Sequence, residues 1–431
     1  MSERIIIDFD DNGKDDSNKK KDNAGERIII DFEDSIDNPE VMDISEIPES
    51  SVEKLLKSKV NSFYKGSSGL NNYFESELIF PEGIDNSFRK KFSLKFADEF
   101  FNTILENNKF IILSSGKGNI YFIDRFTGKL KGKLFFENDS FEKTGIVYEN
   151  RIFINSLNSV CEINNDEFKP KEIYRAESGY YLWSNLNRYK DNIIFTEYNP
   201  ATKKSHLKII NLTNGNNINE YSFDTVSFLS DRICINNNRA YYLFDLNILV
   251  YDFDLNTGTV HSLNKNEGLN KIYTDESSFI FNLGNKLFIT TSSYEIYYLD
   301  LPDSEINFKF SGIKNTYINS TGGFEDNLFT GTLEGWKLFK SSGLQIYSYE
   351  DEFENVIECI SRNILVVSKK NRIVFYNLNR FQEAESYVIS SDTNKESIEI
   401  ISAVISGNEI FVLTKNGILE VYTNDKLNIH I

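Results

Sequence analysis

The chain has 431 residues, of which 40% are apolar and 14% aromatic, and it carries a formal net charge of −18. An acidic surface of this kind repels nucleic-acid phosphates and anionic lipid headgroups, so the composition argues against nucleic-acid and membrane partners. No stretch approaches the ~18 apolar residues of a membrane span, and none has the pattern of a signal peptide.

The first 49 residues form an acidic segment that we expect to be disordered. Residues 1–50 contain 16 Asp and Glu against 6 Lys and Arg, so more than half of the net charge lies in this stretch. Few aromatic residues accompany these charges, and too little apolar surface is available to offset the entropy of the chain.

A short motif occurs twice inside this tail. Glu3–Asp11 reads ERIIIDFDD and Glu26–Asp34 reads ERIIIDFED, with eight of nine positions identical. The motif has β-propensity and no proline, so it can add itself as a strand to the edge of a partner's sheet. Two alternatives are a strand that docks on this chain itself and a duplication without a role. The candidate partner-binding residues are Arg4, Ile5, Ile6, Ile7, Asp8, Phe9, Arg27, Ile28, Ile29, Ile30, Asp31 and Phe32.

An amphipathic helix is predicted at residues 50–66. Ser50 and Glu53 have the spacing of a capping box, and Gly66 is a plausible C-terminal cap. An apolar stripe at helical intervals consists of Val52, Leu55, Leu56, Val60 and Phe63. We expect this helix to pack on the rest of the protein, and the alternative is that it binds a partner.

A hairpin of two apolar strands recurs eight times from Lys109 onward, at steps of 36 to 47 residues. The copies begin at Lys109, Arg151, Asn192, Arg239, Lys286, Asn327, Asn363 and Glu409. Further strand-like runs, such as Lys131–Phe136, lie between the hairpins, so each unit supplies about four strands. This period predicts an all-β β-propeller of four-stranded blades over residues 67–431. Eight blades are preferred, and seven would result if one hairpin were irregular.

A propeller must also close its ring. An N-terminal strand that completes the C-terminal blade removes the exposed edges. Lys91–Phe96 is the preferred closing strand and Lys426–Ile431 is the competing one. A second strand-like run, Phe100–Leu105, precedes the first hairpin.

Several units end in one kind of turn, with the pattern Ile/Val-x-x-x-Asp/Asn-x-x-Thr/Asn-Gly. It occurs in Asn119–Leu130, Lys208–Asn216 and Val250–Val260. We expect the glycine to supply a positive φ and the Asp or Asn side chain to cap local backbone amides. Over residues 78–431 these segments resemble the repeats of the quinoprotein-like (PQQ-like) and WD40-like β-propeller superfamily. The resemblance implies the scaffold, because this fold supports many functions.

The departures from that superfamily argue against its enzymatic chemistry. The quinone-dependent enzymes are exported, and many carry a vicinal disulfide, whereas this chain has neither an export signal nor a Cys-Cys pair. Its outer-membrane lipoprotein members need a lipobox cysteine, and the first cysteine here is Cys161. Only two tryptophans occur, Trp183 and Trp336, and WD-repeat signatures are missing. The resemblance therefore implies a non-enzymatic member that needs no cofactor.

No motif of a metal or catalytic site stands out. The three cysteines, Cys161, Cys234 and Cys359, are dispersed, which predicts buried thiols in a reducing compartment and hence a cytoplasmic protein. The three histidines, His206, His261 and His430, have no ligand spacing and are interpreted as isolated.

Two further segments resemble known sites only superficially. The segment Asp252-x-Asp254-x-Asn256-x-Gly258 misses the calcium-loop pattern, and we expect both aspartates on one face of a strand. Gly116-x-Gly118 lies between two strands and is interpreted as a hairpin turn. We therefore expect neither a metal nor a catalytic residue.

These observations favour a non-catalytic interaction scaffold. Its propeller face would bind a protein, and its twin tail motifs would tether a protein partner. The alternative is a propeller that binds a small ligand or carries an unrecognised enzymatic site. The oligomeric state stays open.

Overall fold

The computed structural model describes residues 4–8, 27–31, 70, 88–137, 139–149, 151–164, 167–213, 218–263, 274–275, 278–291, 295–301, 308–310, 318–350, 356–361, 364–369, 372–388 and 399–423. The predicted helix at 50–66 and the segment Lys426–Ile431 lie outside these residues. Every regular element in the described part is a β-strand. None of the described residues belongs to a helix long and apolar enough to cross a membrane.

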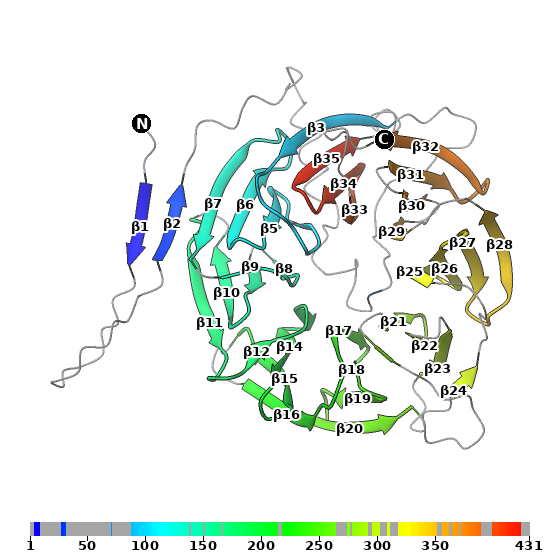
Figure 1. Ribbon diagram of the computed structural model, residues 1–431, viewed down its shortest axis with the longest axis horizontal. Helices are drawn as coiled ribbons and strands as arrows, with labels where there is room; N and C mark the ends of the chain where they lie inside the picture. Colours follow the sequence, from blue (N-terminus) through cyan, green and yellow to red (C-terminus); the bar gives the residue numbers. More distant parts are fainter. Residues whose placement is uncertain are drawn as a thin grey trace.

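Eight antiparallel sheets stand around a central axis as the blades of a propeller, which confirms the prediction of eight blades (Figure 1). Blade 1 contains β4 (Leu105–Glu106), β5 (Phe110–Ser114), β6 (Asn119–Asp124) and β7 (Leu130–Phe136). Blade 2 contains β8 (Ile146–Tyr148), β9 (Arg151–Asn155), β10 (Ser159–Asn164) and β11 (Pro170–Arg175). Blade 3 contains β12 (Tyr181–Leu182), β13 (Asn187–Tyr189), β14 (Asn192–Asn199), β15 (Lys204–Asn211) and β16 (Ile218–Asp224). Blade 4 contains β17 (Leu229–Asn236), β18 (Arg239–Phe244), β19 (Asn247–Asp252) and β20 (Thr257–Ser262).

The second half of the ring repeats the same plan. Blade 5 contains β21 (Ile280–Leu283), β22 (Lys286–Thr290), β23 (Ile296–Asp300) and β24 (Phe308–Phe310). Blade 6 contains β25 (Ile318–Phe324), β26 (Asn327–Thr332), β27 (Gly335–Lys340) and β28 (Gln345–Glu350). Blade 7 contains β29 (Val356–Ser361), β30 (Ile364–Lys369), β31 (Arg372–Asn377) and β32 (Gln382–Val388). Blade 8 contains β33 (Ile400–Ser406), β34 (Glu409–Thr414), β35 (Ile418–Thr423) and β3 (Arg89–Lys95).

The eight hairpins found in the sequence form the second and third strands of the eight blades. These strands are buried on both sides because each blade packs face to face on its two neighbours. All six residues of β34 and of β35 are buried, for example. Burial on both sides explains why the hairpins are continuous apolar runs and do not alternate. The outermost strands, such as β20 and β28, are largely exposed.

The ring closes as predicted, with the N-terminal strand β3 beside the C-terminal strand β35. Arg89 pairs with Thr423 and Lys95 with Ile418, so β3 is the outermost strand of blade 8 (Figure 1). Closure hydrogen-bonds the C-terminal strand to a segment more than 300 residues away in the sequence. This sheet therefore ties the start of the propeller to its end.

A buried ion cluster strengthens the junction of blades 1 and 8. The Arg125 side chain is 1% exposed, and its Nη1 lies 3.2 Å from Glu106 Oε2. Its Nε lies 3.2 Å from Glu409 Oε2 in blade 8, and its Nη2 donates to the oxygens of Ser406. Lys91 on β3 binds the other oxygen of Glu409 at 2.5 Å. One guanidinium thus joins two buried carboxylates from the two blades.

One predicted strand is wrong. Phe100–Leu105 is not a strand, because only Leu105 belongs to β4. The Phe100 amide donates instead to the Lys415 carbonyl of blade 8, so this segment serves as a connector between blades.

Asp252 and Asp254 also do not share a strand face, because β19 ends at Asp252. The Asp252 carboxylate accepts the backbone amides of Asp254 and Leu255, which makes the segment a capped turn. An aspartate does cap this turn, but it is Asp252 and not Asp254, the position that the sequence pattern assigned.

The repeated turn combines two uses of glycine. In blade 1, Asp124 accepts the amides of Phe126 and Thr127, and Gly128 has a φ of +69°, as predicted. In blade 4 the positive φ of +51° falls on Asn256, so the prediction for Gly258 is wrong. A Cβ on Gly258 would lie 2.6 Å from the Tyr221 ring, so this glycine permits a close approach between blades 3 and 4.

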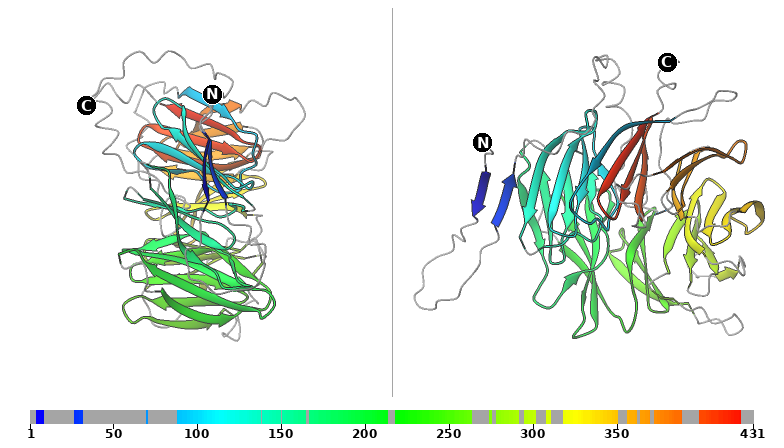
Figure 2. Two further views of the ribbon diagram at one scale, coloured as in Figure 1. Left: turned by 90° about the vertical axis from the view of Figure 1, so that its left-hand side faces the viewer. Right: turned by 45° about the horizontal axis from the view of Figure 1, so that its top comes forward.

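The two tail motifs form strands that extend blade 1. They are β1 (Arg4–Asp8) and β2 (Arg27–Asp31), and the strand order is β1-β2-β7-β6-β5-β4. Figure 2 shows the pair beside β7 on the rim of the ring.

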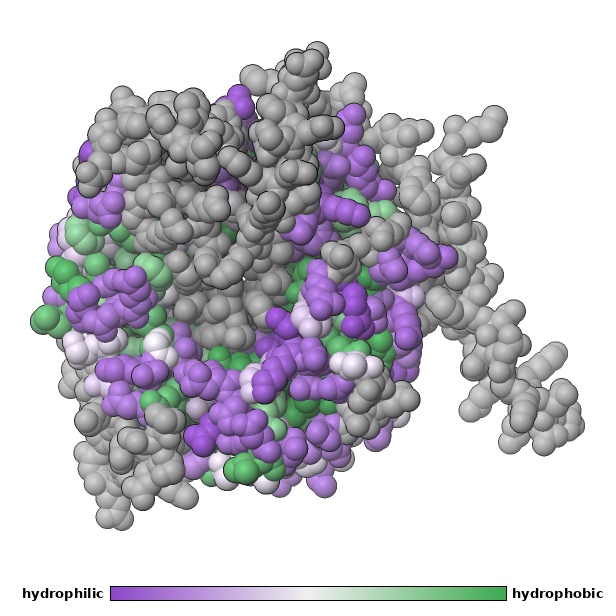
Figure 3. All heavy atoms as spheres, turned by 180° about the vertical axis from the view of Figure 1, so that it is seen from behind, coloured by the Kyte–Doolittle hydropathy of each residue, from purple (hydrophilic) through white to green (hydrophobic). Residues whose placement is uncertain are grey.

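On the side of the ring opposite to that of Figure 1, hydrophobic residues form small groups between hydrophilic ones (Figure 3).

Candidate interaction surface

One face of the ring, here called the tip face, carries the hairpin tips between the second and third strands of the blades. The connectors that lead from one blade to the next lie on the same face. Hydrogen bonds join the two sets: the Gly116 amide in a tip donates to the Glu99 carbonyl in a connector, and the Leu182 amide donates to the Leu157 carbonyl. The turns between third and fourth strands lie on the opposite face, because adjacent strands are antiparallel.

The tip face exposes large apolar side chains. Those that are at least one third exposed on it are Phe101, Leu157, Tyr181, Trp183, Val226, Leu246 and Leu333. Val226 is 71% exposed and Leu157 is 49% exposed. Single exposed apolar residues are common, whereas a contiguous group of them marks an interaction site.

Five of these residues lie on blades 2 to 4 and are here called the apolar band: Leu157, Tyr181, Trp183, Val226 and Leu246. The Leu157 carbonyl accepts the backbone amide of Leu182, the residue after Tyr181. Trp183 reaches blade 4, where its Nε1 donates to the Leu229 carbonyl at 3.0 Å. The Val226 amide donates to the carboxylate of Asp245, the residue before Leu246.

The backbone beneath the apolar band is held in place by hydrogen bonds. The Asp245 carboxylate accepts the amides of Val226, Ser227 and Phe228, each at 2.8 Å. The Trp183 ring packs edge-on against Tyr198 at a centroid distance of 5.8 Å. A surface that is already ordered loses little conformational entropy when it binds. The structure beneath the apolar band is therefore already ordered.

A row of polar groups borders the apolar band toward the centre of the ring. The side-chain oxygen Oδ1 of Asn185 accepts the Thr144 amide at 2.7 Å, and Asn185 Nδ2 donates to the backbone carbonyl of Asp231 at 2.8 Å. Lys143 Nζ lies 3.6 Å from the Asp231 carboxylate and 5.9 Å from the Trp183 ring centroid. These groups link blades 2, 3 and 4, so the three blades that carry the apolar band are tied together.

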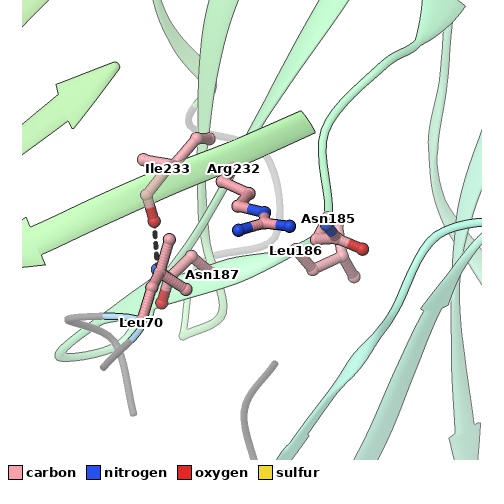
Figure 4. Close-up of a pocket in the computed structure, with 6 residues that line it drawn as sticks. All are labelled: Leu70, Asn185, Leu186, Asn187, Arg232 and Ile233. Atoms are coloured by element: carbon pink, nitrogen blue, oxygen red, sulfur yellow. Dashed lines mark hydrogen bonds between the residues drawn. The ribbon is translucent and has the colours of Figure 1, made fainter. Parts of the chain in front are cut away.

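The segment before the propeller reaches this region through Leu70. Leu70 is 7% exposed and packs with the blade 4 and blade 5 core residues around Phe228 and Cys234. Figure 4 shows it beside Asn187, whose Nδ2 donates to the Ile233 carbonyl at 2.6 Å. The packing of Leu70 on these core residues places it near the inner strands of blades 3 and 4.

A polar cluster that sequence reasoning missed lies between blades 2 and 3. Glu197 is buried, and its Oε1 lies 2.8 Å from His206 Nδ1 and 3.2 Å from Lys208 Nζ. Its Oε2 accepts the Tyr174 hydroxyl at 2.5 Å, and burial together with this bond raises the Tyr174 pKa. His206 is therefore not isolated, and both oxygens of Glu197 are bonded within the protein. Glu197 and His206 pair directly across β14 and β15, which only the strand register could have revealed.

A cavity of about 670 Å³ opens between blades 6 and 7 on the face opposite the tip face. Its walls include Phe324, Phe329, Ile346 and Phe381, and Lys340 lies at its edge. The turn between β31 and β32 forms one side of the cavity. Among the residues that the structure describes, no group of His, Cys, Asp and Glu could hold a metal ion.

The structure brings the two motif copies together on blade 1 and away from the apolar band. Arg4–Asp8 pairs with Arg27–Asp31, and Ile28, Ile29 and Ile30 pair with Phe136, Phe135 and Leu134 of β7. Phe9 and Phe32 lie outside the described residues, as does His430. All three cysteines are buried, as predicted.

Comparisons with known proteins identify the fold alone. No protein-family model and no curated protein matches the chain. The computationally designed Ika8 protein is similar at 12% identity and a TM-score of 0.57, covering 76% of this chain and 97% of its own. BamB from Moraxella catarrhalis is similar at 10% identity and a TM-score of 0.54, with 78% and 98% coverage. The quinohemoprotein alcohol dehydrogenase ADHIIG from Pseudomonas putida is similar at 8% identity and a TM-score of 0.58, with 88% and 82% coverage. The chain is thus an eight-bladed β-propeller whose structural neighbours include PQQ-type propeller proteins.

Proposed function

We propose that this chain is a non-catalytic interaction scaffold that binds a protein partner through the tip face of its propeller. The observation that carries the proposal is the apolar band of blades 2 to 4, which is exposed and rigidly supported. Tryptophan and tyrosine contribute strongly to binding energy at protein interfaces, and the apolar band contains Trp183 and Tyr181.

The charges around the apolar band indicate the chemistry of the partner. Glu177, Asp224 and Asp245 precede Tyr181, Val226 and Leu246 by one to four residues, and Glu177 and Asp224 are exposed. A partner that places basic side chains around an apolar contact would be complementary to this rim. The chain's net charge of −18 would speed the association of such a partner.

The twin motifs supply the tether of the scaffold. They are two copies of a strand-forming segment, and a segment that pairs with β7 of blade 1 can use the same backbone hydrogen bonds with a partner's strand. The tether lies on the outer edge of blade 1, whereas the apolar band lies on blades 2 to 4. The scaffold would therefore use separate surfaces for its two contacts.

The test compares matched pairs of exposed apolar residues. Leu157→Asp with Val226→Asp places charges in the apolar band. Leu255→Asp with Leu344→Asp places the same charges in turns of the opposite face, at positions 71% and 67% exposed. Affinity purification from native lysate, read by quantitative mass spectrometry, should lose its specific proteins with the first pair and keep them with the second. Equal retention by both pairs would refute the proposal.

A second candidate function is small-ligand binding in the cavity between blades 6 and 7. The cavity has the size of a ligand site and combines aromatic walls with a lysine. Lys340 could bind a carboxylate of such a ligand, in competition with Asn327 at 3.0 Å and Asp326 at 3.9 Å, while Glu325 adds an acidic group to the lining. Mass spectrometry of the protein purified from its natural source should then detect a bound organic acid that is lost in a Lys340→Glu variant. Finding no bound molecule would remove this candidate.

A further inference from the structure

The tail motif has a symmetry that explains how its two copies pair. The motif reads Arg-Ile-Ile-Ile-Asp, so one copy placed antiparallel to another sets arginine opposite aspartate at both ends. The structure shows this register: Arg4 is opposite Asp31, Ile6 is opposite Ile29, and Asp8 is opposite Arg27. Opposite charges at directly opposed positions stabilise an antiparallel pair. The motif is therefore self-complementary.

Strand β7 follows the same rule on the other side of β2. Ile28 is opposite Phe136 and Ile30 is opposite Leu134. In the sequence Lys133 precedes and Glu137 follows the three paired residues of β7. The order of one basic, three apolar and one acidic residue thus recurs in both motif copies and along residues 133–137, where β7 itself ends at Phe136. This common pattern specifies the register on blade 1.

β1 is the terminal strand of the six-stranded sheet. β1 has the sequence Arg-Ile-Ile-Ile-Asp, and β2, which pairs with its inner edge, has the same sequence. The outer edge of β1 can therefore pair with a further copy of this sequence in the same way. Edge strands of this kind, without proline, are templates for pairing with another chain. The strand that best matches the outer edge of β1 is therefore another Arg-Ile-Ile-Ile-Asp segment.

We propose that the outer edge of β1 pairs with β1 of a second copy of this chain, forming a two-fold dimer. This inference rests on the tethering half of the proposed function and names the partner of that tether. In the dimer Ile6 lies opposite the second copy's Ile6, and Arg4 lies opposite the second copy's Asp8. An antiparallel pair centred on one residue has two-fold symmetry, so each copy contributes the same surface and the assembly closes at two.

The position of β1 on the rim has a consequence for the scaffold. The dimer joins two blade 1 sheets edge to edge, and the tip faces of both copies remain exposed. One assembly then presents two apolar bands. Two linked sites raise the apparent affinity for a partner that is itself repeated.

The test uses charge exchange within β1 of the full-length protein. Arg4→Asp gives acidic residues at both ends of the strand, and Asp8→Arg gives basic residues at both ends. In the dimer each variant alone opposes like charges at two positions, which should weaken the dimer roughly ten- to hundredfold. Within its own chain each variant also opposes one like charge of β2, which is Asp31 for Arg4→Asp and Arg27 for Asp8→Arg, and this pair is the same in the single variants and in their mixture. An equimolar mixture restores opposite charges at both positions and should form a mixed dimer.

Sedimentation velocity over a range of micromolar concentrations measures the result. The wild type and the mixture should sediment as dimers, and each single variant as a monomer. A wild type that stays monomeric at every concentration overturns the proposal. Single variants that dimerise as well as the wild type also overturn it, because they show that the contact lies elsewhere, such as an exchange of tail hairpins on β7.

The same proteins separate this inference from the proposed function. The variant with Leu157→Asp and Val226→Asp should still dimerise while losing the tip-face partner. A monomeric Asp8→Arg variant that still captures that partner leaves the tip-face function intact. A dimeric wild type with no tip-face partner would uphold the dimer and refute the scaffold.

Discussion

Removing the positive charge at the junction of blades 1 and 8 should destabilise the whole ring. In an Arg125→Met variant the carboxylate of Glu106 loses its cation while it stays buried, whereas Glu409 keeps Lys91 at 2.5 Å. Breaking a buried ion pair from one side costs about 3–5 kcal/mol. We expect the free energy of unfolding to fall by this amount in urea titrations.

The dependence on pH follows from the same contacts. In the native chain burial lowers the pKa of Arg125, but Glu106 and Glu409 raise it by more, so the guanidinium stays charged. Without Arg125, burial raises the pKa of the Glu106 carboxyl in the folded state. A raised folded pKa favours folding at low pH, so the deficit of the variant should shrink as the pH falls through the raised pKa toward the ordinary value of a glutamate, about 4.3.

The control is the double variant Glu106→Gln with Arg125→Met, which removes both charges. It should recover more than half of the loss, because no unpaired charge remains buried in blade 1. A single variant that loses less than about 1 kcal/mol would refute the argument. So would a double variant that is no more stable than the single one.

Three further predictions concern local features. Gly118→Ala should cost about 1–3 kcal/mol in urea unfolding, because Gly118 has a φ of +79° and an added Cβ would lie 2.3 Å from the Phe136 carbonyl. Burial raises the pKa of Asp98, but hydrogen bonds, that of Tyr121 first, lower it by more, so its stabilisation should be lost as pH falls through the lowered value. In an Asp98→Asn variant the free energy of unfolding should fall less steeply at acid pH. An unchanged dependence of that free energy on pH would contradict the lowered pKa of Asp98. The three cysteines should react with a thiol reagent only after unfolding, since all are buried and burial raises the Cys234 pKa; rapid labelling of the native protein would contradict this.

Much of the fold followed from the sequence because propeller blades are local units. Each hairpin, such as Phe110 to Asp124, pairs within a few residues, and the face-to-face packing of blades makes its strands uniformly apolar. The closing strand was predictable because a ring must pair its ends. The cap by Asp124 was predictable because its bonds are made two and three residues away. In blade 4 the same bonds are made by Asp252, two residues before the aspartate that the pattern assigned.

The candidate site could not be predicted in the same way. The apolar band contains Leu157, Trp183 and Val226, which come from three different blades, and no local pattern says that they are exposed on one face. The inner strand of blade 3 is interrupted between Leu182 and Asn187, and this break places Trp183 at the surface. Such a feature depends on how neighbouring blades pack.

The tail shows an intermediate case. The duplication was evident, and a strand docked on the propeller itself was one of the alternatives that the sequence left open. The choice of β7 depends on its Lys133–Glu137 pattern, which is recognisable only once β2 and β7 are known to be neighbours.

Hydrogen–deuterium exchange on the captured complex would test the central claim most directly. Peptides containing Leu157, Trp183 and Val226 should exchange more slowly in the complex than in the free protein, while the turn containing Leu255 should not change. Protection confined to the cavity of blades 6 and 7, or protection that spares the apolar band, would contradict the claim that the tip face binds the partner.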